Sequence, residues 1–216
     1  RIGIKNGAGV FKRITDLTSA WQTANNENID IENIRNYDYE LYTQLSKLKE
    51  SLLSDGYMDF SYAIRMATDE LKKITDKKGT DIEKYQYLFV DEYQDINPIQ
   101  EEFIKTFSEF LDMLFVVGDD DQSIYGWRGA NVQNILTFKD RYKDVSTHKL
   151  LINFRSTKAI VETANSFVKS TLNYKRLSKD ISSHSDGNIQ DLRNLWFENR
   201  EEEAKWIARR IKSLVG

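Results

Sequence analysis

The chain has 216 residues, of which 40% are hydrophobic and 30% charged, so it can bury a sizeable core in one or two domains. Its net charge of −3 argues against a general polyanion-coating role, and any binding of nucleic acid must therefore rest on specific residues. The sequence has no cysteine, no run of about 18 apolar residues and no signal-peptide pattern. These features exclude disulfides and thiolate metal sites, and we expect a cytoplasmic location.

The first third of the chain predicts helices that serve packing rather than chemistry. A short helix is expected over residues 10–23, followed by an Asn-rich loop. A second helix begins near Tyr37 and ends at Asp55-Gly56, and its apolar face is formed by Leu41, Leu45, Leu48 and Leu52. A third helix is expected from Phe60 to about Ile74.

Two apolar runs then predict neighbouring parallel strands with acidic ends. Residues 85–90 read as a buried strand that breaks into Asp91-Glu92-Tyr93-Gln94-Asp95, and residues 113–117 open into Gly118-Asp119-Asp120-Asp121-Gln122. Ligands of open α/β sheets bind at the carboxyl ends of strands, so both ends are expected to carry chemistry. Two acidic ends side by side would repel each other unless a cation or an arginine lay between them, and a Mg²⁺ site is the economical explanation.

The rest of the chain alternates between helices and strands. A helix starts at Pro98, with Asn97 and Gln100 forming a capping box and a buried face of Ile99, Phe103, Phe107 and Phe110. We further expect a helix over 131–141, a strand over 148–152, a helix capped by Ser156 or Thr157, a polar loop over 171–188, a strand near 192–197 and a helix over 200–214. The apolar faces of the two later helices are Ile160, Val161, Ala164, Phe167 and Val168, and Ala204, Ile207, Ala208, Ile211 and Leu214.

An Asp-Glu pair at a strand end suits nucleotide hydrolysis. Asp91 can hold Mg²⁺ directly or through water, and Glu92 can take a proton from the attacking water. An isolated Asp-Glu pair would more often be plain surface, but the preceding strand and the second acidic end favour the chemical role. The amide of Gln122 can accept from a water and donate to a phosphate, which suits sensing of a γ-phosphate, although such a side chain alone is more often a hydrogen-bonding loop residue.

A second group of residues has the chemistry of a nucleic-acid contact. Tyr125, Trp127 and Arg128 lie on a glycine-flanked loop, where aromatic rings can stack on bases and the arginine can neutralise a phosphate. The alternative places Trp127 in the core as a cap on the sheet. Arg155 lies between a predicted strand and a helix, from where a guanidinium can reach a phosphate across a cleft, and its alternative is a surface salt bridge.

Three of these segments together resemble a known family. Asp91 to Asp95, Gly118 to Ala130, and Asn153-Phe154-Arg155-Ser156 are similar to motifs II, III and IV of the UvrD/Rep family of superfamily 1 ATP-dependent DNA helicases, in order and at fitting spacing. The middle motif is long and specific. A looser resemblance includes Met58-Asp59-Phe60 and the Glu201-Glu202-Glu203-Ala204 helix.

The resemblance implies an α/β fold, specifically an incomplete RecA-like P-loop NTPase fold with a parallel sheet and flanking helices. Residues 1–58 would form a helical insertion region (1B-like). Residues 59–147 would form part of the first RecA-like domain with motifs II and III, and residues 148–216 the start of the second with motif IV.

On the nucleotide side, the resemblance implies ATP and Mg²⁺ as ligands. Asp91 would coordinate the metal together with Glu92, and Glu92 would activate the hydrolytic water. Gln122 would link the γ-phosphate to the DNA site. Phe154, where the family often has Tyr, would pack against the adenine, and Arg155 would act as an arginine finger from the second domain.

On the DNA side, the resemblance implies single-stranded and duplex DNA as partners. Trp127 and Tyr125 would stack on single-stranded bases, and Arg128 would couple the strand to the ATP site. The resulting activity is ATP hydrolysis coupled to translocation and duplex unwinding.

The sequence also departs from the family pattern. None of its ten glycines is followed by lysine, so it contains no Walker A loop. We therefore expect a fragment that is inactive as an isolated chain and is either marginally stable or associates with another copy. Two alternatives remain: a non-catalytic DNA- or protein-binding module derived from a helicase, and a Mg²⁺-dependent nuclease using Asp91, Glu92 and Asp119–Asp121.

Overall fold

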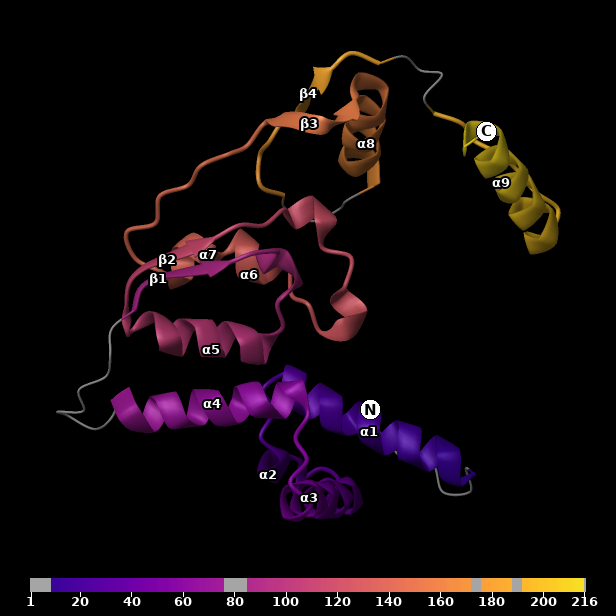
Figure 1. The fold of residues 1–216 in the computed structure, drawn as a ribbon. Helices are drawn as coiled ribbons and strands as arrows, with labels where there is room; N and C mark the ends of the chain where they lie inside the picture. Colours follow the sequence, from indigo (N-terminus) through magenta and orange to yellow (C-terminus); the bar gives the residue numbers. More distant parts are fainter. Residues whose placement is uncertain (1–8, 76–84, 172–175, 188–191, 216) are drawn as a thin grey trace. The chain divides into compact units, whose positions relative to one another are not determined.

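The computed structural model describes residues 9–75, 85–171, 176–187 and 192–215, and it has a mixed α/β structure with two small parallel sheets (Figure 1). The chain divides into two compact units. The first unit is Arg1–Val145 with Lys175–Leu177, and the second is Ser146–Tyr174 with Ser178–Gly216. Within the described ranges, no helix combines the length and the apolar character that crossing a membrane requires.

The first unit begins with four helices: α1 (Val10–Asn26), α2 (Ile31–Ile34), α3 (Tyr39–Ser54) and α4 (Phe60–Thr75). The three longer helices are confirmed predictions, whereas α2 lies in the expected loop. The leucine face of α3 is also confirmed, because Leu41 and Leu45 are buried while Leu48 and Leu52 pack against the same cluster. Helices α1 and α4 meet in this cluster through the rings of Trp21 and Tyr62, whose centroids are 5.2 Å apart.

The sheet of the first unit pairs β1 (Tyr85–Val90) with β2 (Leu111–Val116) in parallel, as predicted. Helix α5 (Pro98–Ser108) connects the strands, packs against β2 and lies alongside α4 (Figure 1). Its predicted capping box is present, since Asn97 Oδ1 accepts from Gln100 N and Gln100 Oε1 accepts from Asn97 N, both at 3.0 Å. Because the connection is a crossover between parallel strands, both strands end at the same edge.

The two faces of this sheet differ in burial. On one face, Leu88, Val90, Leu114 and Val116 pack against a core of Tyr93, Ile96 and Ile104. On the other face, Tyr87 and Phe115 are exposed and Phe89 retains 70% of its accessible surface. The prediction that β1 is buried is therefore wrong for its outer face, because in a strand successive side chains point to opposite sides and the described core lies on one of them.

Short helical segments follow β2: η2 (Asp120–Gln122), η3 (Gly126–Arg128), α6 (Gln133–Leu136) and α7 (Phe138–Arg141). The single helix expected over 131–141 is therefore wrong. Thr137 separates α6 from α7, with φ −105° and ψ 18°, and its hydroxyl donates to the Gln133 carbonyl at 2.7 Å. A threonine that bonds back to the preceding turn competes with the regular helix and favours a break.

The second unit contains β3 (Ile152–Thr157), α8 (Lys158–Thr171), β4 (Ser182–Ser185) and α9 (Arg200–Val215). Strands β3 and β4 pair in parallel. Two strand predictions and one loop prediction are wrong: β3 starts where the expected strand was to end, residues 192–197 are not a strand, and β4 lies in the expected loop.

Both helices of the second unit lie where they were predicted, but their expected apolar faces are mostly exposed. On α8, Val161 is buried while Phe167 is exposed, and Ala159 is buried although it was not predicted to be. On α9, Ile207, Ile211 and Leu214 are exposed, and the described part of this helix has no buried residue. Amphipathic spacing predicts the helix, but burial also requires a partner surface.

Candidate functional site

The parallel pairing of β1 and β2 brings the two acidic segments to one edge. Val117 N donates to Val90 O at 2.8 Å, and Tyr93 N donates to Val117 O at 2.9 Å. The chain therefore turns away from β1 while still bonded to the end of β2. Asp91-Glu92 and the segment that starts at Gly118 leave the sheet side by side, which confirms the expected adjacency of the strand ends.

Asp91 and Glu92 form an exposed turn immediately after β1. Asp91 Oδ1 accepts from the Glu92 backbone N–H at 2.9 Å. Glu92 has φ 50° and ψ 43°, a left-handed conformation that costs a residue with a side chain about 1–2 kcal/mol. Backbone strain of this kind concentrates at active sites and ligand clamps. The left-handed turn starts η1 (Tyr93–Asp95) and leaves both carboxylates at the surface.

Gln94 bridges the two strand ends, although sequence analysis assigned it no role. Its side chain is 1% exposed. Nε2 donates to Glu92 Oε2 at 2.7 Å, and Oε1 accepts from Asp119 N at 3.0 Å. The amide lies within the first acidic motif, but its burial and its partner on the second motif depend on strand pairing that no local pattern reveals.

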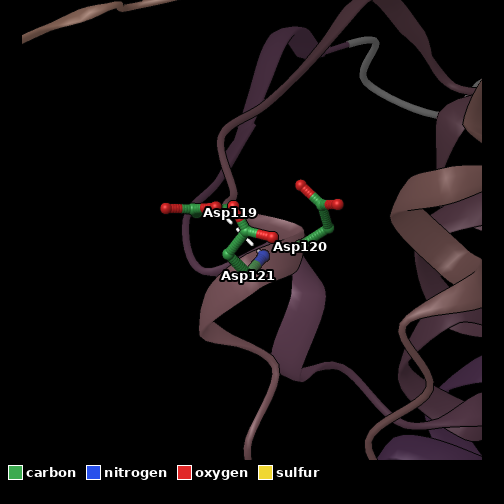
Figure 2. A group of neighbouring side chains, drawn as sticks. All are labelled: Asp119, Asp120 and Asp121. Atoms are coloured by element: carbon green, nitrogen blue, oxygen red, sulfur yellow. Dashed lines mark hydrogen bonds between the residues drawn. The ribbon is translucent and has the colours of Figure 1, made fainter. Parts of the chain in front are cut away.

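The second acidic segment carries three consecutive aspartates, Asp119, Asp120 and Asp121 (Figure 2). One carboxylate oxygen from each lies within 4.8 Å of the other two. Asp119 accepts from Asp121 N at 3.1 Å and from Gln122 Nε2 at 2.8 Å. Asp120 is fully buried and accepts from Leu177 N at 2.9 Å. Each carboxylate therefore already has a partner within the first unit.

Arg176 offsets part of the negative charge of the two acidic segments. Its guanidinium forms an ion pair with Asp121, with Nε donating to Oδ1 at 2.7 Å. We expected a cation or an arginine near the acidic ends, but residues 171–188 were predicted only as a polar loop and gave no sign of this arginine. The contact joins positions 55 residues apart in the chain.

The site has carboxylate oxygens of the kind that suit a divalent cation. Asp95 Oδ1 is buried without a hydrogen-bond partner, and burial together with the negative charge of Glu92 raises the pKa of the Asp95 carboxyl. The exposed carboxylates of Asp91 and Glu92 offer oxygen atoms of the kind that Mg²⁺ prefers. The chemistry of the residues present therefore fits the expected metal, which Asp91 and Glu92 at the end of β1 would hold.

A buried polar cluster around Glu101 holds the turn after β1 in place. The Tyr93 hydroxyl and the Arg141 guanidinium both bond to the Glu101 carboxylate, and the Tyr142 hydroxyl donates to Glu101 Oε1 at 3.2 Å. Burial raises the pKa values of Tyr93 and Tyr142, and the neighbouring Glu101 charge raises them further. Both phenols therefore stay neutral donors, and the cluster holds η1 against α5 and α7.

The predicted DNA-contacting residues lie on and beside η3. Trp127 is 74% exposed, which is inconsistent with the alternative of a core residue, and Tyr125 is also exposed. Their ring centroids are 6.5 Å apart with an interplanar angle of 54°. The Arg128 side chain lies outside the described part of the structure. Gly129 has φ 87°, and a Cβ there would lie 3.0 Å from Glu27 Oε1, so a glycine lets the loop approach the end of α1.

Phe154 and Arg155 belong to the second unit and lie within β3, not after a strand as predicted. Both side chains are exposed. The Phe154 ring contacts His184 on β4 with a centroid distance of 4.7 Å. Asn153 Oδ1 accepts from the backbone N–H groups of Arg155 and Ser156 at 2.9 and 2.8 Å, which orders the backbone at Arg155.

Comparison with known proteins identifies the chain. Residues 8–143 match the UvrD/REP helicase N-terminal domain, and residues 148–216 match the UvrD-like helicase C-terminal domain. The chain is 34% identical over 218 residues to the ATP-dependent DNA helicase Rep of Buchnera aphidicola subsp. Acyrthosiphon pisum (strain APS), covering 97% of this chain and 32% of that protein. It is 31% identical over 238 residues to the ATP-dependent DNA helicase PcrA of Staphylococcus aureus (strain Mu50 / ATCC 700699), covering 98% and 32%.

A further relative is the ATP-dependent DNA helicase PcrA of Bacillus subtilis (strain 168), which is 35% identical over 178 residues, covering 82% of this chain and 24% of that protein. The chain spans about a third of the length of the first two relatives. The N-terminal domain match alone takes in more than half of the chain. The chain therefore belongs to the UvrD/REP helicase family.

Proposed function

We propose that the chain is part of an ATP-dependent DNA helicase in which ATP hydrolysis drives translocation on single-stranded DNA and unwinding of the duplex. The observation that carries the proposal is the parallel pairing of β1 and β2, which sets Asp91-Glu92 beside Asp119–Gln122. The names of the similar proteins support the same activity. Residues 59–147 and 148–216 are then parts of two RecA-like domains, and residues 1–58 are a helical insertion.

In the proposed hydrolysis, Glu92 takes a proton from a water whose oxygen attacks the γ-phosphorus, and ADP leaves with the bridging oxygen. Asp91 and Glu92 are the residues that would hold Mg²⁺. When bound, this metal neutralises charge on the phosphate oxygens. Gln122 is tied to Asp119 at 2.8 Å and would exchange that bond for the γ-phosphate. Its amide can both donate and accept, so it can read whether the phosphate is present.

The second unit carries two further residues that we propose for nucleotide binding. Phe154 is an exposed ring on β3 that could pack against the adenine, and Arg155 is an exposed guanidinium beside it that could stabilise the phosphate charge of the transition state. On the DNA side, Trp127 and Tyr125 would stack on bases and Arg128 would contact the strand. The exposure of both rings fits this role.

The experiment replaces Glu92 with glutamine in the full-length protein that contains this chain. Glu92→Gln preserves the side-chain shape but removes the base, so single-strand-stimulated ATP hydrolysis should fall about 100- to 10,000-fold. Binding of a fluorescent ATP analogue should remain. Glu109→Gln, the same change at an exposed residue that ends α5, serves as the matched control. Turnover at the wild-type rate in Glu92→Gln would contradict the proposed role.

A further inference from the structure

We propose that Gln94 is a positioning residue that orients the Glu92 carboxylate and ties this orientation to the Asp119–Gln122 segment. The inference rests on the proposed function, in which Glu92 is the base that accepts the proton of the attacking water. Gln94 touches neither water nor nucleotide in this arrangement. It acts through the two acidic segments between which it is buried.

The orientation of the Gln94 amide follows from its partners. Asp119 N is a backbone N–H and can only donate, so the atom that faces it at 3.0 Å must be the carbonyl oxygen of the amide. The NH₂ group is thereby directed to the other side, where it donates to Glu92 Oε2 at 2.7 Å and lies 3.4 Å from Asp95 Oδ2. A reversed amide would place the NH₂ group against the Asp119 N–H and the oxygen against a carboxylate, so this orientation is strongly preferred.

The surroundings leave the amide no room to move. Gln94 is 1% exposed, and a Cβ at position 118 would lie 2.7 Å from its Oε1, so Gly118 makes space for it. The Ser123 hydroxyl donates to the Gln94 backbone carbonyl at 3.3 Å, which holds its main chain to the second segment as well. The Gln94 side chain is therefore a rigid hydrogen-bonded link between the segments that follow β1 and β2.

Glu92 needs such a link to fix its rotamer, because it lies exposed on a left-handed turn. An exposed glutamate samples several rotamers, whereas a general base must hold one oxygen within hydrogen-bond reach of the water. Gln94 donates to Glu92 Oε2, and we propose that Oε1 is the atom that accepts from the attacking water. The chain of hydrogen bonds continues through Asp119 to Gln122, whose Nε2 lies 2.8 Å from Asp119 Oδ2. A shift of Gln122 onto a γ-phosphate would thus reach the base through Gln94.

The test uses two substitutions in the full-length protein. Gln94→Glu keeps the shape and the acceptor for Asp119 N but replaces the donor with a carboxylate beside Glu92. Gln94→Met keeps the length and removes both polar ends. Both should lower the kcat of oligo(dT)-stimulated ATP hydrolysis about 100-fold, because a misplaced catalytic group costs about that much, while the Kd of a fluorescent ATP analogue changes by no more than about twofold. Gln22→Glu, the same change on the exposed face of α1, should match the wild type.

A double substitution separates this inference from the proposed function. If Gln94 acts through Glu92, adding Gln94→Glu to Glu92→Gln should cause no further loss of kcat. Three results would overturn the positioning role: full kcat in Gln94→Glu, an added loss of kcat in the double variant, or a loss of ATP-analogue binding in Gln94→Glu as large as its loss of kcat. If Glu92→Gln is inactive, each of these results leaves the proposed function standing. Wild-type turnover in Glu92→Gln alone would instead overturn the proposed function, and the inference with it.

Discussion

Replacement of Trp127 by alanine should weaken binding of single-stranded DNA without unfolding the protein. Trp127 is 74% exposed, so about a quarter of its surface is buried. Full burial of a large apolar side chain is worth about 1.5–3 kcal/mol, and Trp127→Ala should therefore cost the fold less than about 1 kcal/mol. The loss of one base stack costs about 1–3 kcal/mol, which corresponds to a Kd about 5- to 150-fold higher.

The geometry of the two rings indicates that one stack is lost rather than two. Tyr125 and Trp127 are tilted by 54° with centroids 6.5 Å apart, so one base cannot lie flat against both, and Tyr125 keeps its own face in the variant. The assay is a fluorescence-anisotropy titration of labelled oligo(dT) with the full-length protein at one fixed salt concentration, alongside a thermal melt. Trp196→Ala, at an exposed tryptophan of the second unit, is the control. Unchanged oligo(dT) affinity in a folded Trp127→Ala variant would refute the stacking role.

Three further predictions concern ATP turnover by the isolated chain, its mass in solution and its stability in alkali. The 216-residue polypeptide should not hydrolyse ATP at a helicase-like rate, because none of its glycines precedes the lysine of a phosphate-binding loop, and turnover that disappears in Asp91→Ala would contradict this. Light scattering should show it to be larger than one chain, because Tyr87, Phe89 and Phe115 expose an aromatic face, and a monomer would contradict that. Burial raises the pKa of Tyr142, so its contribution to stability is fully present below the ordinary tyrosine pKa of about 10 and is lost as the pH rises above it. Between pH ~10 and ~11, the free energy of unfolding in urea should therefore fall more steeply for the wild type than for Tyr142→Phe, by less than about 1 kcal/mol because solvent screens this half-buried group. Equal slopes for both proteins would contradict the burial of this phenol.

Local signals in the sequence predicted the elements that position the site. Each of three signals depends only on residues of one short segment: the apolar run of β1, the leucine spacing of α3 and the capping box of Asn97 and Gln100. All three features are present in the structure. The adjacency of the two acidic ends followed from the strand, helix and strand alternation. These features were predictable because period and capping chemistry are properties of short segments.

The remainder depends on contacts between distant segments. Strand β4 has the sequence Ser182-Ser183-His184-Ser185, which shows no apolar alternation, so its pairing with β3 could not be predicted from hydrophobicity. The same holds for Arg176, which pairs with Asp121 across 55 positions, and for Gln94, whose partner on the second segment is Asp119. In the sequence, a polar residue of a short motif gives the same signal whether its side chain faces solvent or bridges two strands. Only its burial in the folded structure distinguishes the two cases.

The most direct test of the central claim measures strand separation by the full-length protein on a partial duplex with a single-stranded tail. Unwinding should require both ATP and Mg²⁺, disappear in Glu92→Gln and persist in Glu109→Gln, while Glu92→Gln should still bind the DNA and the ATP analogue. A protein that binds the tailed DNA but neither hydrolyses ATP nor separates its strands would instead be a non-catalytic module, and that result would contradict the proposed helicase activity.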